Sequence, residues 1–209
     1  MEGAVIPETV VKTKEHLVQL HKRGRMLVAS YEAIRHQKLD LFSITLRQIG
    51  ANIASMQLMD AVNVLINGDG NDNAIFAYST EKEGVLTYAD LVDLWTKMRP
   101  YEMSTMLVSE DLMGQLLKLP ELQNPAGGMN FAGTGKLVTP FGATLLCVGD
   151  MPASRIIGLD KRYALELVEC GDVCVEYDKL IDRQLERAAI TSISGFGKIC
   201  DGAAAVLNV

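Results

Sequence analysis

The sequence predicts an α+β protein in which helices and strands do not alternate regularly. Three observations support this class. Residues 40–66 carry a long helical pattern of apolar side chains, residues 67–73 form a turn-rich segment, and the chain after residue 136 consists of short strand-like segments. No internal repeat is present. A chain of 209 residues with 48% hydrophobic and 22% charged residues can bury a core, in one domain or two closely joined ones.

The long helix is the clearest element. Asp40 is placed to cap its start and Gly68 to end it. Apolar side chains recur at three- and four-residue spacing along it: Phe42, Leu46, Ile49, Ile53, Met56, Leu58, Ala61, Val62 and Leu65. At 1.5 Å per residue such a helix is about 40 Å long, which is more than a small compact domain needs. We therefore expect it to act as a spine.

The N-terminal region predicts extended structure. Residues 9–20 and 25–31 are rich in polar and β-branched side chains, and the pattern predicts two strands joined near Lys22-Arg23-Gly24. A hairpin that is polar on both faces has little to bury. It therefore requires a long sheet or a neighbouring chain beside it.

The rest of the chain contains shorter elements. Helices are predicted at 88–98, between a capping Thr87 and Pro100, and at 109–117. A buried strand is predicted at 103–108 and a glycine-rich flexible loop at 124–136. The C-terminal half predicts strands at 137–138, 143–148, 155–159, 164–169, 173–177, 187–194 and 203–207.

Charge and composition exclude several classes of function. The formal net charge is -6 and the pI is about 5.1, which is contrary to the basic surface of a protein that coats nucleic acid. The basic cluster from His21 to Arg25 has no aromatic residue for base stacking, and we interpret it as a charge contact between subunits. No apolar run approaches the roughly 18 residues of a membrane span, and no export signal is recognisable, so we expect a soluble chain.

The cysteines predict no disulfide. Cys147, Cys170, Cys174 and Cys200 form no CxxC pair, and each has apolar neighbours. Gly171-Asp172 is a plausible hairpin turn, which would not place Cys170 opposite Cys174. We expect buried free thiols, and no metal site, because no histidine lies nearby in the sequence.

Two loops resemble ligand-binding motifs only in part. Asp69, Asn71 and Asn73 match the first half of a calcium loop, but Ala74 and Thr80 stand where glycine and a bidentate glutamate belong. The segment Gly133–Lys136 resembles a phosphate-binding loop, but Leu137 replaces the serine or threonine that follows the lysine. We interpret both as ordinary turns.

No set of residues predicts catalysis. The histidines, His16, His21 and His36, have no spacing suited to a metal or a triad, and no serine lies in a nucleophile elbow. The carboxylate pairs Glu166/Glu169 and Glu176/Asp178 are expected to face solvent. The sequence therefore predicts no catalytic, cofactor-binding or metal-ligating residue, no cofactor and no enzyme activity.

Four segments, in order, resemble the major capsid proteins of tailed bacteriophages, which share the HK97 fold. Residues 27–34 resemble the end of the family's extended loop, and residues 40–54, which close on Gly68-Asp69-Gly70, resemble its spine helix. Residues 137–143 resemble the entry into the axial sheet. Residues 190–197 followed by 203–207 resemble the closing pair of strands.

The resemblance implies an HK97-like fold with a long spine helix. It places residues 1–75 and 163–198 in a peripheral domain with the extended loop, and residues 76–162 and 199–209 in an axial domain with a mixed sheet and flanking helices. Family members carry an N-terminal arm before the extended loop, whereas this chain starts at about the middle of that loop, as an N-terminally short form would. The crosslinking lysine and asparagine of some relatives have no counterpart here, so no crosslinking is expected.

The implied function is that of a structural subunit of an icosahedral phage capsid, assembled in the bacterial cytoplasm and resident in the virion. Expected partners are copies of itself in pentamers and hexamers, scaffolding and portal proteins, and packaged DNA through weak non-specific contact; no membrane is expected. Two alternatives remain at this point. One is an encapsulin-type compartment shell, and the other is a small soluble enzyme or ligand-binding protein with a site assembled from distant residues.

Overall fold

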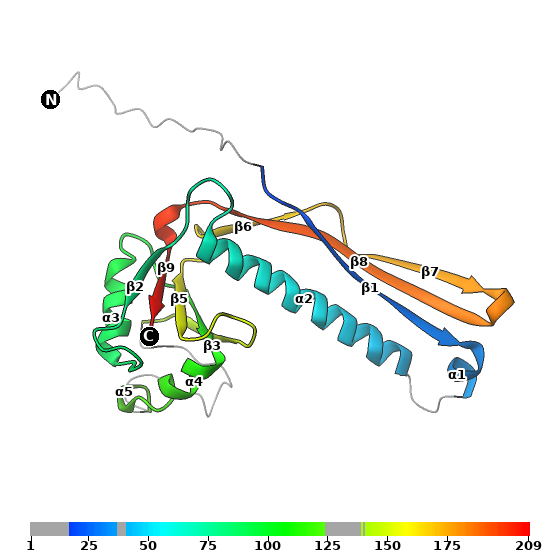
Figure 1. Ribbon diagram of the computed structural model, residues 1–209, viewed down its shortest axis with the longest axis horizontal. Coiled ribbons are helices and arrows are strands. Elements are labelled where there is room, and N and C mark those ends of the chain that lie inside the picture. Colours follow the sequence, from blue (N-terminus) through cyan, green and yellow to red (C-terminus); the bar gives the residue numbers. More distant parts are fainter. Residues whose placement is uncertain (1–16, 37–40, 124–138, 140) are drawn as a thin grey trace, which may run out of the picture.

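The computed structural model describes residues 17–36, 41–123, 139 and 141–209, and within them the strands form two separate sheets. The first sheet and a long helix make an elongated part that we call the arm, and the second sheet with its short helices makes a rounder part that we call the head (Figure 1). The arm projects from the head, so the molecule is far from spherical.

The arm sheet is organised around one long strand, β8 (Leu185–Lys198). Strand β1 (His21–Ser30) pairs with one edge of β8 along its whole length, and all pairings in this sheet are antiparallel. Strands β6 (Leu165–Glu169) and β7 (Cys174–Leu180) lie end to end along the other edge of β8. Helix α1 (Tyr31–His36) and the 3-10 turn η2 (Ile181–Arg183) close the far end, where Tyr31 N–H donates to the Gln184 carbonyl at 2.9 Å.

The spine helix α2 (Leu41–Asn67) runs along this sheet. Its end is set by Gly68, which has a φ of +83° and donates its N–H to the Val64 carbonyl at 2.9 Å. Only glycine adopts this left-handed conformation without steric cost. The prediction of a long helix ended by Gly68 is confirmed, whereas the capping role of Asp40 lies outside the described residues.

The head contains a mixed five-stranded sheet in the order β2-β9-β5-β3-β4. The outer pairs β2/β9 and β3/β4 are parallel, and the inner pairs are antiparallel. The bounds of the strands are β2 (Phe76–Ser79), β3 (Thr105–Ser109), β4 (Thr144–Val148), β5 (Arg155–Leu159) and β9 (Ala204–Asn208).

Short helices cover the head: α3 (Tyr88–Lys97), α4 (Glu110–Leu116), α5 (Pro120–Gln123) and the 3-10 turn η3 (Asp201–Ala203). Helix α3 begins with a capping box, in which Thr87 and Asp90 exchange side-chain and backbone hydrogen bonds. The predicted helices at 88–98 and 109–117 are confirmed. Helices α1 and α5 and strand β2 are too short to give a periodic signal and were not predicted.

Successive side chains of the head strands point to opposite faces of the sheet, and each face has its own apolar core. Met106, Val108 and Ile156 lie in the cluster that includes the α3 and α4 side chains. Leu107, Ile157 and Val206 point to the opposite face, where Val62 and Leu65 from the end of α2 cover them. The head sheet is therefore sandwiched between its own helices and the end of the spine, which joins the arm to the head.

The predicted N-terminal hairpin is wrong. Lys22-Arg23-Gly24 lies inside β1, and the partner of β1 is β8, more than 150 residues later in the chain. Gly24 does not make a turn but permits close strand packing, since an added Cβ would lie 2.6 Å from the Ile190 carbonyl oxygen. Residues 17–20 are not in a strand, and residues 9–16 lie outside the described part of the chain.

The predicted turn at Gly171-Asp172 also does not make a hairpin. Strands β6 and β7 pair with β8 and not with each other, because both lie on the same edge of it. The other C-terminal strands were predicted within a few residues, although β8 is longer than expected. The strand predicted at 137–138 and the loop predicted at 124–136 lie outside the described residues.

Candidate assembly surfaces

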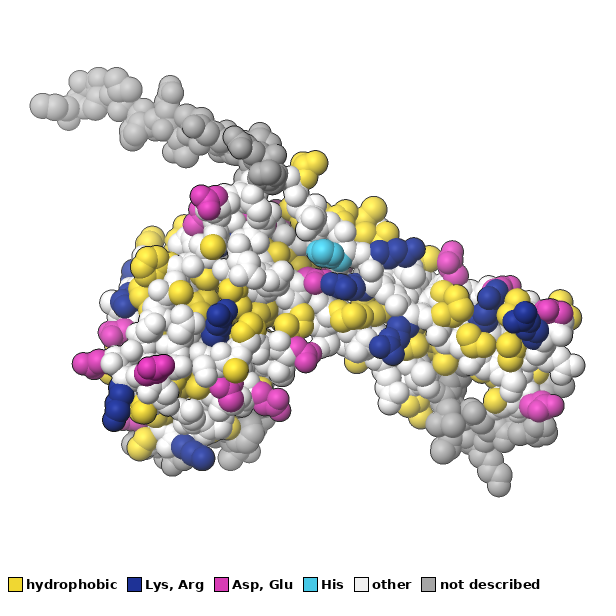
Figure 2. Space-filling model, in the orientation of Figure 1, with side chains coloured by type: hydrophobic (Ala, Val, Ile, Leu, Met, Phe, Trp, Pro, Cys, Tyr) yellow, Lys and Arg dark blue, Asp and Glu magenta, His cyan; other side chains and the backbone are white. Residues whose placement is uncertain are grey.

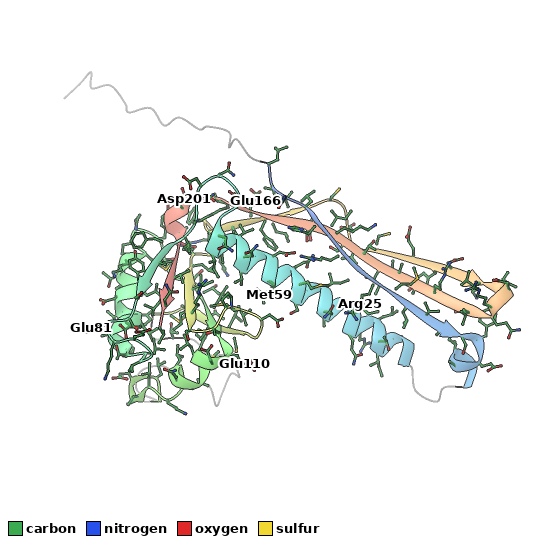
Figure 3. All side chains as sticks on the ribbon, viewed as in Figure 1. Arg25, Met59, Glu81, Glu110, Glu166 and Asp201 are labelled. Atoms are coloured by element: carbon green, nitrogen blue, oxygen red, sulfur yellow. The ribbon has the colours of Figure 1, made fainter. Side chains whose placement is uncertain are left out.

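The arm has a small apolar core. Its buried cluster consists of Ile49 and Ile53 from α2 and Ile190 from β8, with Leu27, Leu46 and Met56 packed partly against it. The head, by contrast, contains two large buried clusters. Side chains accordingly crowd the head and thin out along the arm (Figure 3). So small a core contributes little to holding a projecting sheet, because stability scales with apolar area removed from water.

Apolar side chains are instead exposed along the arm. Tyr177 is 70% exposed and Ile181, at the far tip, is 80% exposed. Figure 2 shows apolar side chains reaching the surface along the arm as well as on the head. The exposed large apolar residues of the arm and of the segment before it are Leu17, Leu20, Met26, Val28, Ile34, Ile44, Leu58, Leu167, Val173, Val175, Tyr177 and Ile181. Val175 and Tyr177 are two residues apart on β7 and therefore share a face, and exposed apolar side chains grouped in this way are typical of a contact site.

The β7–β8 hairpin, which carries Val175, Tyr177 and Ile181, has charged cross-strand pairs. Asp178 and Arg187 lie directly opposite each other and form an ion pair, and Lys179 Nζ lies 2.9 Å from Glu186 Oε1 in the next pair. The hydrogen bond from Arg187 lowers the pKa of Asp178, and the hydrogen bond with Glu186 raises the pKa of Lys179. These exposed pairs add little to the backbone pairing of the two strands.

The spine helix has an uncovered side. Only Arg47 and Asp60 are charged among the residues of α2, and Ile44 and Leu58 are exposed on it. By length and composition the stretch Ser43–Asn67 would suffice to cross a membrane, which the count of consecutive apolar residues did not anticipate. Its buried residues pack against both sheets, while Met59, labelled in Figure 3, packs partly against the head cluster.

Polar contacts fix α2 to the arm sheet. Arg23 of β1 donates two hydrogen bonds to Asp60, Nη2 to Oδ1 at 2.6 Å and Nε to Oδ2 at 3.2 Å. Gln57 Nε2 donates to the hydroxyls of Ser192 and Ser194 at 3.2 and 3.0 Å. The interpretation of the basic cluster as a contact between subunits therefore fails for Arg23, whose partner lies in the same chain. Lys22 and Arg25 are exposed.

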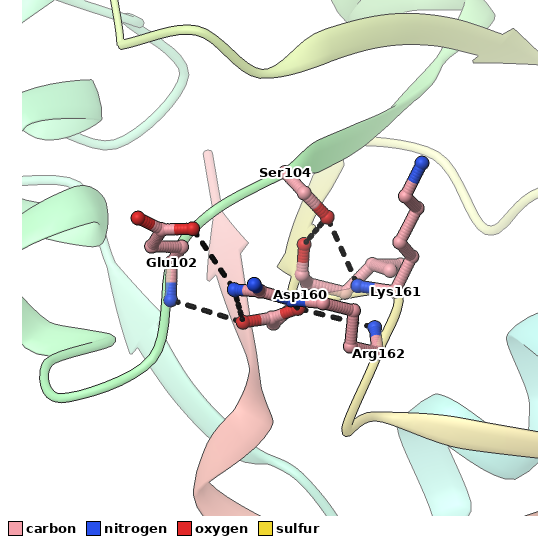
Figure 4. A network of polar contacts seen from close by, with 6 residues as sticks. Glu102, Ser104, Asp160, Lys161 and Arg162 are labelled. Atoms are coloured by element: carbon pink, nitrogen blue, oxygen red, sulfur yellow. Dashed lines mark hydrogen bonds and ion pairs between the residues drawn. The ribbon is translucent and has the colours of Figure 1, made fainter.

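A polar network around Asp160 joins the connection between β5 and β6 to the segment that precedes β3 (Figure 4). Asp160 is fully buried and accepts hydrogen bonds from the Glu102 N–H at 3.2 Å, and from the N–H and guanidinium of Arg162 at 3.1 to 3.2 Å. The hydrogen bond from Arg162 lowers the pKa of Asp160 despite the burial that opposes it. Ile199 and Cys200 donate their N–H groups to the carbonyls of Ala164 and Tyr163, which ties the connection between β8 and β9 to the connection between β5 and β6.

The loop that resembles a calcium site is closed by protein contacts. Asp69 accepts hydrogen bonds from Lys198 N–H at 2.9 Å and from the Asn71 side chain at 2.8 Å, and Asn73 Oδ1 accepts from Asp69 N–H at 3.0 Å. Lys198 is 2% exposed, and its ammonium donates to the Asn73 carbonyl at 2.5 Å. The loop thus fastens the end of α2 to the end of β8. The buried Lys198 was not identified from the sequence, because a lysine at a strand end gives no signal of burial.

The other residues weighed as possible site residues do not lie together in one site. Glu166, Glu169, Glu176 and Asp178 are exposed, as expected. Within the described ranges, no three histidine, cysteine or acidic side chains lie together as metal ligands. His21 is exposed on β1, nothing is described of His16 or of the His36 side chain, and Gly133–Lys136 lies outside the described residues.

The thiols are free but not buried, so the prediction of burial was wrong. Cys147, Cys170 and Cys174 are exposed and Cys200 is half-buried. Apolar sequence neighbours did not indicate burial here, since alternate positions of an edge strand face solvent.

Two uneven lobes, a spine and an exposed apolar arm are features of a protein that packs against other copies. A family model described as Phage capsid protein matches residues 13–170. The chain belongs to this family. As a phage capsid protein it is a structural subunit of the virion shell and not an enzyme, which confirms the predicted function and excludes the reading as a small enzyme or ligand-binding protein. Comparison with curated protein sequences gave no match.

Solved structures with the same fold include viral and cellular shells. The capsid of a native GTA particle has a TM-score of 0.68 at 18% identity, covering 100% of this chain and 79% of that chain. The match to Mycobacterium phage Che8 has a TM-score of 0.68 at 13% identity, and it covers 90% of this chain and 70% of that chain. The match to the holo-SrpI encapsulin complex from Synechococcus elongatus has a TM-score of 0.64 at 13% identity, and it covers 90% of this chain and 73% of that chain. The predicted HK97-like α+β fold is confirmed.

Proposed function

We propose that this capsid subunit builds a closed icosahedral shell from rings of five and six copies around a packaged genome. Closed shells require contacts that repeat around rings, each joining two different surfaces of the subunit. The GTA particle structures, computed with C5 symmetry, support rings of five for this fold. Scaffolding and portal proteins are further partners in this proposal, with assembly in the bacterial cytoplasm.

The proposal rests on the contrast between the small buried cluster of the arm and the apolar side chains exposed along it. A projecting sheet and helix share only a small buried cluster, while apolar residues such as Tyr177 and Ile181 are exposed along it. An isolated sheet of this kind gains little from folding, because ordering the chain costs entropy that its own core does not offset. Burial against a neighbouring copy supplies the missing apolar area.

The two sheets support the division into domains. We assign residues 1–75 and 163–198 to a peripheral domain and residues 76–162 and 199–209 to an axial domain. Every strand of the arm sheet falls in the first set and every strand of the head sheet in the second, among the residues described. In the shell, the head would face the centre of each ring and the arm would lie across a neighbour.

Contact with packaged DNA is proposed to be weak and non-specific. The net charge is -6, and Arg23 of the basic cluster is neutralised by Asp60. The excess of acidic over basic residues opposes binding through displacement of counterions from phosphates, which is the main source of affinity for DNA.

The encapsulin alternative differs in what the shell encloses. The structural similarity to an encapsulin and to a virus-like particle from Pyrococcus furiosus supports the shared fold, while the match to the phage capsid family favours the viral role. Particles purified after expression in a phage-infected host should contain nuclease-protected DNA. A protein cargo in place of DNA would favour the compartment instead.

Assembly itself is tested on the purified chain. Light scattering over a range of concentrations, followed by negative-stain microscopy, should show rings or shells above a threshold concentration. A subunit that stays monomeric at every concentration, also when co-expressed with its scaffolding protein, would contradict the proposal.

A further inference from the structure

The segment before β1 crosses over strand β8 at two glycines. A Cβ added at Gly195 would lie 2.1 Å from the Gln19 carbonyl oxygen and 3.1 Å from Val18 Cγ1. A Cβ added at Gly197 would lie 3.0 Å from Val18 Cγ2. Residues 195 and 197 are two apart on one strand and therefore present the same face. The backbone of residues 18–19 occupies the space in which side chains would stand on that face.

Backbone conformation does not explain these glycines. Neither has a positive φ, so any residue could adopt the local geometry. The close approach of the crossing segment is the reason that a side chain is excluded. The two positions differ in severity, because Gly195 is opposed by a backbone oxygen that cannot turn away, whereas Gly197 is opposed by the tip of a side chain.

The crossing segment is not held by burial of its own side chains. Leu17 is 91% exposed and Leu20 is 43% exposed, and among residues 17–20 only Val18 is half-buried. The opposite face of β8 is occupied by α2, whose Gln57 binds Ser192 and Ser194. The path of the segment therefore depends on its steric fit to the glycine face of β8.

We propose that Gly195 and Gly197 form a saddle that sets the direction of the chain at Leu17 and thereby aligns one capsid subunit on the next. Of these two statements, only the alignment of subunits rests on the proposed shell function. The saddle itself is a property of the single subunit. It makes the two glycines positioning residues for assembly through the path of residues 18–19.

The saddle is tested first on the isolated subunit by hydrogen exchange with mass spectrometry. Gly195→Ala should raise exchange in the peptide covering residues 17–24 by about tenfold or more, with peptides from α3 and β5 unchanged. Gly114→Ala is the matched control, because it adds the same methyl group where nothing lies within 4 Å. Unchanged exchange at 17–24 in folded Gly195→Ala would overturn the saddle.

A second pair of variants identifies the contact. Val18→Ala removes the atom that opposes Gly197, so the double variant Val18→Ala/Gly197→Ala should restore the exchange that Gly197→Ala raises. The same truncation should fail to rescue Gly195→Ala, whose clash is with the Gln19 backbone. Rescue of both, or of neither, would contradict the proposed geometry.

Assembly provides the final readout. Wild type and Gly114→Ala should form shells, while folded Gly195→Ala should assemble at least tenfold more slowly or into aberrant particles. Normal assembly of Gly195→Ala with raised exchange would overturn the alignment role. Failure of the wild type to assemble would count against the shell function and leave the exchange result as the separate test of the saddle.

Discussion

Replacing Tyr177 by threonine should weaken assembly without weakening the subunit. Tyr177 is 70% exposed on β7. If a neighbouring copy covers it, about 140 Å² leaves water, which is worth about 3.5 kcal/mol at roughly 25 cal/mol/Å². Threonine, like tyrosine, is favoured in strands, and it retains about a third of that area, so each contact loses about 2 kcal/mol.

A loss of this size corresponds to about a 30-fold weaker contact. The threshold concentration for assembly, measured by light scattering, should therefore rise about 30-fold. The melting temperature of the unassembled subunit should stay unchanged, because exposed substitutions shift stability by less than about 0.5 kcal/mol.

The matched control is Phe76→Thr, which removes a 66% exposed aromatic ring from strand β2 of the head. We expect it to change the threshold less than Tyr177→Thr does. A threshold for Tyr177→Thr within twofold of wild type would refute the reasoning that the arm is covered by a neighbour. Equal effects of the two variants would refute the special role of the arm.

Three further predictions test the subunit itself. Ile53→Asp places an unpaired charge in the arm cluster and should destabilise the fold by about 3–5 kcal/mol; a wild-type urea midpoint would mean that the buried face of α2 is wrongly assigned. Gly68→Ala should cost about 1–3 kcal/mol, since φ is +83° and the new Cβ would lie 2.6 Å from Asn73 Oδ1. Gly84→Ala, also at positive φ but in open space, should cost less by the same unfolding assay, and the reverse order would contradict the steric argument. Asp160→Asn should make the free energy of unfolding fall less steeply as the pH is lowered. The pKa of Asp160 is lowered in the folded protein, so its ionised carboxylate contributes full stability above the ordinary pKa of about 3.9. That contribution is lost as the pH falls through the folded pKa, and asparagine has no such contribution to lose. The free energy of unfolding is measured from pH 6 to pH 2. An equally steep fall with pH for wild type and variant would exclude the contribution of the Asp160 carboxylate.

The elements identified correctly from sequence depend on local interactions. The spine helix follows from apolar spacing and from Gly68, and α3 follows from Thr87 and its capping box. These signals lie within a few residues of the element they specify, so no knowledge of distant parts of the chain is needed.

The errors concern partners that are distant in sequence. Lys22-Arg23-Gly24 has the composition of a turn, yet it lies within a strand because β8 packs closely against Gly24. Gly171-Asp172 has the composition of a hairpin turn, yet β6 and β7 both pair with β8. A strand pattern specifies which residues can pair but not which strand is the partner.

The sequence alone determined the class of the protein, the spine helix, and the lack of any residue pattern that predicts catalysis, since composition and periodicity are local properties. The tertiary structure decided which apolar side chains stay exposed, how Tyr163 and Ala164 accept hydrogen bonds from the connection between β8 and β9, and why Gly195 must lack a side chain. Each of these depends on atoms brought together from distant parts of the chain. Burial and close approach are set by that packing, and no single segment encodes them.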